Sequence, residues 1–261
     1  MDGKVYLPVG FCVYCGSTQN LTDEHILPLA LNGTAVLPKS SCQHCAKETG
    51  RIEQVLLRGS LWPARVFRDL KSRTKHRDAP KTYPVTAVFG CKELELSIAI
   101  DKLPILIPFP IFAPPRVMSG KPLANGIDIL GVDTICFGTS PEELVRELNA
   151  NEIRIGKSEN PNIFARVLAK IAYSYAYAEG ALKDLAEPSP VVPAILGKSQ
   201  NIGNWVGILD HSNQSHPRAL HRIELMHEEQ RRLLLAEVQL FADSQTPSYV
   251  VVLGRLSERN T

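Results

Sequence analysis

Two cysteine pairs, each with two residues between its members, constrain this chain more than any other feature of its sequence. The first pair is Cys12 and Cys15, and the second is Cys42 and Cys45. Four thiolates at this spacing can bind one zinc ion tetrahedrally, and four protein ligands leave no open position on that metal. We therefore predict a structural zinc ion at these cysteines, so any chemistry belongs to residues that the zinc keeps in place.

The segment between the two pairs is longer than in a plain zinc ribbon. Residues 16–41 make up 26 residues, whereas about 15–20 separate the pairs in ribbons of this kind. Asp23, Glu24 and His25 form an acidic, histidine-containing triplet within it, and Asn32-Gly33 is typical of a chain reversal between two short strands. We expect a β-hairpin over residues 21–37, followed by a helix from the second cysteine pair to about residue 61.

This order of residues resembles the HNH nuclease family. The matching features are C-x2-C, then D-E-H-I-x-P, then a glycine-containing turn, then S-C-x2-C at the start of a helix, over about residues 11–60. The resemblance implies the ββα-metal fold, in which a four-cysteine zinc holds a hairpin against a helix. A zinc-ribbon binding module is the alternative interpretation of the same residues.

The resemblance also implies roles for two residues of the triplet. In the HNH family the acidic residue before the histidine binds a catalytic metal and the histidine is the general base, so the matching residues here are Glu24 and His25. A neutral imidazole can deprotonate water near pH 7, and a divalent cation can neutralise the phosphate. Carboxylate ligation favours Mg or Mn, at a site distinct from the zinc.

Two positions depart from the family pattern. Leu37 stands where the family usually has Asn, and Ala46 stands where it usually has His or Asn. A second ligand for the catalytic metal must then come from elsewhere. We predict Glu53, which follows Ala46 by seven residues and so shares its face of a regular helix; Asp23 and Glu48 are weaker candidates.

Positive charge is concentrated beside the cysteine-rich segment. Residues 51–81 contain nine Lys and Arg against three Asp and Glu, a local charge of +6 in a chain whose net charge is +2. Such an excess suits a phosphate backbone, and a solvated helix face followed by a basic linker is the alternative. The candidate phosphate contacts are Lys39, Lys47, Arg51, Arg58 and Arg65.

The rest of the chain predicts a second, larger domain. We expect residues 1–70 to form the HNH-like domain, residues 71–82 a basic linker, and residues 83–261 an α+β domain with a mainly antiparallel sheet. The expected elements are a hairpin around residue 90, an irregular loop at 104–122, a helix at 141–150, a helix at 162–185 and four C-terminal strands. This domain would recognise the target, a protein partner or a trigger, or it would mediate oligomerisation.

Composition indicates the class of protein. The chain has 261 residues, 44% of them hydrophobic, which is enough for a buried core. No long apolar run is free of charge or proline, and the N-terminus lacks the pattern of a signal peptide, so we expect no membrane association. Isolated Cys91 and Cys136, which we place in the core, and four cysteines in metal-type pairs suit a reducing cytoplasm.

A second acid–histidine group lies near the C-terminus. It consists of Asp210, His211, His216 and His221. Irregular spacing among Ser, Asn and Gln residues favours a surface loop over a metal site.

The sequence as a whole predicts a metal-dependent HNH-like endonuclease that hydrolyses DNA, with RNA as a further possible substrate. Mobile-element or anti-phage defence work would suit a nuclease of this size. Two alternatives belong to other classes. One is an HNH fold that has lost catalysis and only binds nucleic acid, and the other is a structural zinc module that serves a protein-interaction domain. Salt-sensitive DNA binding without cleavage would indicate the first.

Overall fold

The computed structural model describes residues 4–70, 81–155, 160–210 and 215–258. The fold is mixed α+β, and the strand pairs in all four described sheets are antiparallel, as the sequence predicted. The N-terminal elements are β1 (Leu21–His25), a 3-10 turn (Leu29–Leu31), β2 (Val36–Cys42), α1 (Gln43–Arg58) and α2 (Trp62–Phe67). The predicted hairpin and helix are therefore confirmed.

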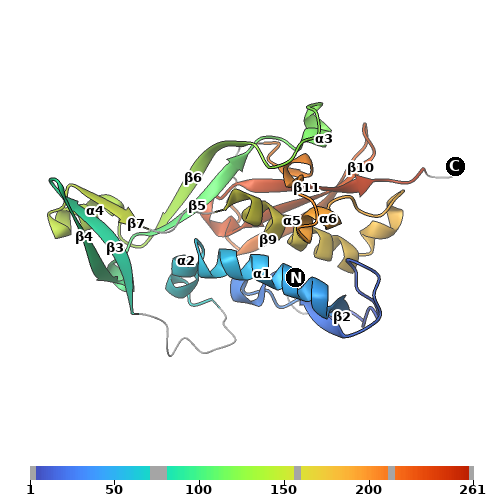
Figure 1. Ribbon diagram of the computed structural model, residues 1–261, viewed down its shortest axis with the longest axis horizontal. Helices are drawn as coiled ribbons and strands as arrows, with labels where there is room; N and C mark the ends of the chain where they lie inside the picture. Colours follow the sequence, from blue (N-terminus) through green and yellow to red (C-terminus); the bar gives the residue numbers. More distant parts are fainter. Residues whose placement is uncertain (1–3, 71–80, 156–159, 211–214, 259–261) are drawn as a thin grey trace.

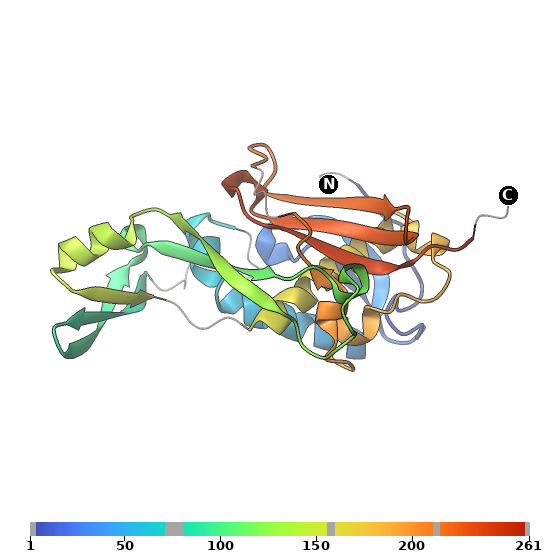
Figure 2. The ribbon, with the colours of Figure 1, turned by 90° about the horizontal axis from the view of Figure 1, so that it is seen from above.

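The middle of the chain forms a small sheet and a long two-stranded ribbon. The sheet contains β3 (Thr82–Phe89), β4 (Lys92–Ala99) and β7 (Glu152–Ile155), with α4 (Pro141–Leu148) beside it. The ribbon consists of β5 (Ile105–Phe112) and β6 (Ile129–Phe137), and the short helix α3 (Arg116–Ser119) follows β5. Figures 1 and 2 show the small sheet projecting from one end of the molecule, connected to the main body through the ribbon.

The C-terminal part contains one long helix and a four-stranded sheet. The helices are α5 (Pro161–Ala178) and α6 (Val192–Ile195). The strands are β8 (Val206–Gly207), β9 (His221–Glu228), β10 (Leu233–Leu240) and β11 (Ser248–Arg255), in the order β8-β11-β10-β9. No described helix is both long and apolar enough to cross a membrane.

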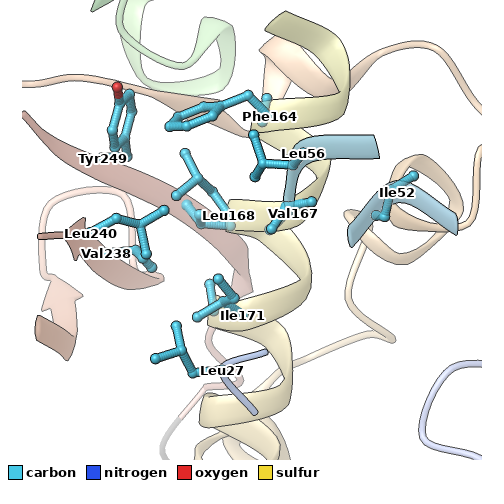
Figure 3. Close-up of a cluster of buried hydrophobic side chains, with 14 of the residues drawn as sticks. Leu27, Ile52, Leu56, Phe164, Val167, Leu168, Ile171, Val238, Leu240 and Tyr249 are labelled. Carbon is cyan, nitrogen blue, oxygen red and sulfur yellow. The ribbon is translucent and has the colours of Figure 1, made fainter. Parts of the chain in front are cut away.

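Helix α5 is the centre of the fold. Its side chains are buried on nearly every face, which is typical of a helix enclosed by other elements. Figure 3 shows Phe164 and Leu168 on α5 facing Leu240 and Tyr249 of the sheet, while Ile52 and Leu56 of α1 lie on another side of α5. The helix therefore packs between the C-terminal sheet and residues 4–70, which are called the cysteine-containing unit or N-terminal unit below.

The cysteine-containing unit shares its core with the C-terminal part. The buried residues of α1 are spaced by four and three along the helix, at Cys45, Thr49, Ile52 and Leu56, and form one stripe. A single cluster of buried side chains runs from Cys12 through α5 to Leu253. Residues 1–70 are thus joined to residues 83–261 by a continuous core, and residues 71–80 of the predicted linker lie outside the described residues.

The predicted irregular loop at 104–122 is wrong over its first half, because β5 is a regular strand. The prediction took the prolines of this segment as evidence against a strand, because proline cannot donate a backbone hydrogen bond. Pro108 and Pro110 are two residues apart, so both missing N–H groups lie on one edge of the strand. The intervening residues remain free to pair with β6.

The predicted core positions of Cys91 and Cys136 are also wrong. Both cysteines are exposed, Cys91 in the turn between β3 and β4 and Cys136 near the end of β6. The prediction rested on the general tendency of cysteine to be buried in folded proteins, which neither residue follows. Neither position has a second cysteine in a metal-type spacing.

Candidate metal centre and its neighbouring acidic pair

Four cysteine thiols converge at one point of the N-terminal unit. The sulfur atoms of Cys12, Cys15, Cys42 and Cys45 all lie within 4.8 Å of one another, and those of Cys15 and Cys42 are 3.6 Å apart. A tetrahedral zinc ion with Zn–S bonds of about 2.3 Å requires sulfur atoms about 3.8 Å apart. The arrangement therefore fits a structural metal ion such as zinc.

Local backbone structure places the two cysteine pairs. Cys12 and Cys15 lie in a tight turn in which the N–H of Gly16 donates to the carbonyl of Cys12. Gly16 has a φ of 76°, a conformation that glycine adopts at little cost. Cys42 ends β2 and precedes α1, so Cys45 lies in the first turn of that helix. The turn and the strand–helix junction thus bring all four thiols to one point, with Cys15 on its exposed side.

A buried lysine joins the two carboxylates that the sequence singled out. The Nζ atom of Lys170, on α5, lies 2.7 Å from Oε1 of Glu24 and 2.8 Å from Oε1 of Glu53. It also donates a hydrogen bond to the backbone carbonyl of His25. The Lys170 side chain is only 1% exposed, and that of Glu24 is 6% exposed. The structure therefore brings Glu24 and Glu53 to one cation, and that cation is an ammonium.

Electrostatics keep this lysine charged. Burial lowers the pKa of Lys170, but the facing carboxylates of Glu24 and Glu53 outweigh that effect, so its pKa is raised above the ordinary value. Burial raises the pKa of Glu24, and the ammonium of Lys170 offsets part of that rise. The group is therefore an ion pair whose members depend on one another.

The acidic pair does not fit the Mg or Mn ion that the family resemblance implies. Such an ion needs octahedral coordination and usually keeps several waters. Here Lys170 Nζ already lies within hydrogen-bonding distance of both carboxylates, and Lys170 and Glu24 are buried. A hydrated divalent ion and the ammonium cannot share this position.

The other predicted residues of the acidic site have separate positions. His25 is partly exposed, and strand alternation turns its side chain away from the face that Glu24 occupies. Asp23 is exposed and accepts a hydrogen bond from the backbone N–H of Lys39. Glu48 pairs with Arg51 at 3.4 Å on the surface of α1. Neither Asp23 nor Glu48 lies with Glu24 and Glu53 on Lys170.

Four of the five predicted phosphate contacts are exposed. They are Lys39, Lys47, Arg51 and Arg58. The last three recur along α1 at intervals of four and seven residues, so they form one stripe opposite its buried face.

Arg65 is different, and its predicted role needs correction. It is 9% exposed, and its guanidinium donates to the carbonyls of Ala30 and Leu57. Those bonds connect α2 with the hairpin and with the end of α1. Arg65 is a structural residue, because its donors are directed inward and are occupied. Helical spacing alone could not reveal this, since α2 is a separate helix from α1.

Sequence reasoning missed Lys170. The residue is flanked by Ala169 and Ile171 in the apolar stripe of the long helix, so a charged side chain there needed a buried partner. That mismatch was the available signal. The partner could not be identified from spacing, because Glu24 and Glu53 are more than a hundred residues away.

The second acid–histidine group does not form a metal site among the described residues. The cysteine group is the one cluster of potential metal ligands found there. His221 begins β9 and packs against Phe241 rather than lying in a surface loop, and its Nδ1 accepts a hydrogen bond from the backbone N–H of Phe241. His211 lies outside the described residues.

Comparison with known proteins adds no family to these observations. The chain matches no family model, no curated protein and no solved structure. The geometry of the described residues is therefore the basis for a functional proposal.

Proposed function

We propose that this chain is a zinc-containing nucleic-acid-binding protein that contacts phosphates through the outer face of α1 without hydrolysing them. One observation carries the proposal, namely the division of charge between the two faces of this helix. Lys47, Arg51 and Arg58 face solvent, whereas Glu53 faces inward and binds Lys170. Zinc is the proposed metal because four thiolates in tetrahedral geometry favour it.

The basic stripe has dimensions that suit a nucleic-acid backbone. Lys47 and Arg58 are eleven residues apart, which is about 16 Å along a helix. A duplex presents one phosphate per strand about every 3.4 Å along its axis. The stripe can therefore reach several phosphates.

The acidic pair supports binding without hydrolysis. Metal-dependent cleavage requires a cation that touches the scissile phosphate. The carboxylates of Glu24 and Glu53 both face Lys170, whose ammonium is buried too deeply to reach a bound phosphate. The endonuclease activity that the HNH resemblance implies is the competing proposal, because His25 occupies the position of the general base.

Salt-dependent binding to a labelled duplex tests the proposal. Replacing Lys47, Arg51 and Arg58 together by alanine should weaken binding at least about tenfold. It should also reduce the steepness of the logarithm of the binding constant against the logarithm of the salt concentration by up to about 3. Lys121→Ala is the control, because this exposed lysine follows α3 and is not part of the α1 stripe. Equal binding by the triple variant would reject the α1 face.

A cleavage assay with Mg or Mn separates the competing functions. We expect intact plasmid with the wild-type chain at every metal concentration. Cleavage that His25→Ala abolishes, with the zinc retained, would establish the endonuclease instead. Absence of both cleavage and low-salt binding would favour a structural zinc module that serves protein interaction.

A further inference from the structure

We propose that the ammonium of Lys170 occupies a site that could otherwise bind a hard divalent cation. This site, here called the cage, consists of oxygen atoms from Glu24, Glu53 and the backbone carbonyl of His25. The native chain then takes a metal at its cysteines and none at its carboxylates. This inference goes beyond the proposed function, since it concerns metal occupancy and does not depend on binding to nucleic acid.

The ammonium has as many donors as the cage has facing oxygens. A lysine ammonium has three N–H donors. Lys170 meets three acceptors, which are Oε1 of Glu24 at 2.7 Å, Oε1 of Glu53 at 2.8 Å and the carbonyl oxygen of His25. Every donor therefore has a partner inside the protein. A full set of acceptors is what permits a charged lysine to remain in a core.

The same three oxygens are the donor type that Mg²⁺ and Mn²⁺ prefer. Carboxylate and backbone carbonyl oxygens are hard ligands, and two carboxylates suffice to attract such a cation when water completes its coordination. The cage carries two formal negative charges before the lysine is counted. Lys170 contributes one positive charge, which reduces the charge of the cage to −1, and its ammonium occupies the position between the carboxylates that a divalent ion would need.

The cage and the cation come from different parts of the chain. Glu24 and His25 are fixed by β1, where Glu24 pairs with Leu37 of β2, and Glu53 is fixed by α1. Lys170 comes from α5, more than a hundred residues later. The oxygens can therefore keep their arrangement when the lysine side chain alone is changed.

Manganese binding measured by electron paramagnetic resonance on the zinc-loaded chain tests the proposal. Wild type should bind no Mn²⁺ with a dissociation constant below about 1 mM, a range that a two-carboxylate site reaches. Lys170→Gln, which removes the charge and keeps an amide donor, should gain one Mn²⁺ per chain. Adding Glu53→Gln to that variant should abolish the gain, while zinc content stays the same in all three.

Two results would overturn the proposal. One is Mn²⁺ binding by the wild type that Glu53→Gln alone removes, since the carboxylates would then hold a metal beside the lysine. The other is a folded, zinc-loaded Lys170→Gln chain that binds no Mn²⁺. Neither result depends on nucleic-acid binding, so failure of this inference and failure of the proposed function are distinguishable.

A measurement on the unmodified chain covers the case in which Lys170→Gln does not fold. The ammonium protons of a buried, fully hydrogen-bonded lysine exchange slowly and give a ¹H–¹⁵N signal at its Nζ. We expect this signal to remain unchanged when Mg²⁺ is added to about 10 mM, far above the range of a typical protein site. A specific shift or loss of the Lys170 signal would show that Mg²⁺ enters the cage, and would reject the proposal.

Discussion

The ammonium of Lys170 on α5 lies 2.8 Å from the carboxylate of Glu53 on α1, inside the core that the two halves of the chain share. Glu24 of the hairpin binds the same ammonium. Three elements that are distant in sequence are therefore connected through one charge. Because the group is buried, each member is costly without the others.

Removing the lysine alone should destabilise the fold strongly. Lys170→Met leaves the buried carboxylate of Glu24 and the partly buried carboxylate of Glu53 without their cation, and breaking a buried pair in this way typically costs about 3–5 kcal/mol. Urea denaturation of the zinc-loaded chain measures it. The matched control adds Glu24→Gln and Glu53→Gln, and we expect it to recover at least half of the loss. Equal destabilisation in both variants would mean that packing, and not charge, is responsible.

Removing the metal should unfold the N-terminal unit. Cys12 and Cys45 are buried in the shared core. Without the metal, water could not solvate their thiols, so the folded arrangement would lose its stabilisation. We expect Cys45→Ser to lose most of its bound zinc and to lower the melting temperature. Cys91→Ser is the control, because Cys91 is an exposed cysteine outside the cluster. Full zinc content in Cys45→Ser would contradict the four-cysteine site.

The sequence predicted those features that depend on neighbours along the chain. Cysteine spacing predicted the metal cluster because each pair lies within one turn of backbone. The helix predicted at 141–150 begins after Ser140, which forms a capping box with Glu143, a pattern that depends on residues three apart. The turn at Gly90 joins two strands as expected. Each of these features depends on residues that are close together in the sequence.

Long-range contacts could not be predicted in the same way. Lys170 finds Glu24 and Glu53 only after α5 has packed on α1, and one sequence does not specify that approach. Arg65 was predicted to contact a phosphate, but it lies on α2, a helix separate from α1, and its guanidinium donates to the carbonyls of Ala30 and Leu57. Burial is a tertiary property, and it decides the role of both cations.

Arg58 and Arg65 should respond oppositely to replacement by alanine. Arg58 is exposed, so its loss should weaken duplex binding and leave stability within about 0.5 kcal/mol of wild type. Arg65 donates to the carbonyls of Ala30 and Leu57, so its loss should cost about 1.5–3 kcal/mol. Thermal unfolding and binding titrations on both variants separate the two effects. A stability loss at Arg58 as large as that at Arg65 would refute this distinction.

Acid should destabilise the fold through His221. Burial is the main cause that lowers the pKa of His221 from 6.5 to about 4, and Arg68 lowers it further, while the Leu31 carbonyl and Asp243 oppose the change. Because the folded chain binds this proton less readily than the unfolded chain, stability is complete above pH 6.5 and falls as the pH drops towards 4. The full loss is about 3 kcal/mol.

A variant isolates this contribution from that of the titrating carboxylates. His221→Asn keeps an acceptor for the backbone N–H of Phe241 but carries no proton in this range. The free energy of unfolding should therefore fall more steeply in the wild type than in the variant between pH 6.5 and 4. Parallel curves would show that His221 is solvated in the folded chain.

Two glycines of the cysteine-containing unit should respond oppositely to alanine. A Cβ at Gly33 would lie 1.9 Å from the carbonyl oxygen of Leu27, so the hairpin loop must move and stability should fall by about 1–3 kcal/mol. A Cβ at Gly50 meets nothing within 4 Å, and alanine favours a helix interior by about 1 kcal/mol over glycine. Gly50→Ala should therefore raise the melting temperature and leave zinc content unchanged. Because the clashing residue Leu27 is two residues after His25, Gly33→Ala should also loosen the cage around Lys170, which the ¹⁵N signal of its ammonium would report as faster exchange. A stabilising Gly33→Ala would mean that the loop is wider than this backbone allows.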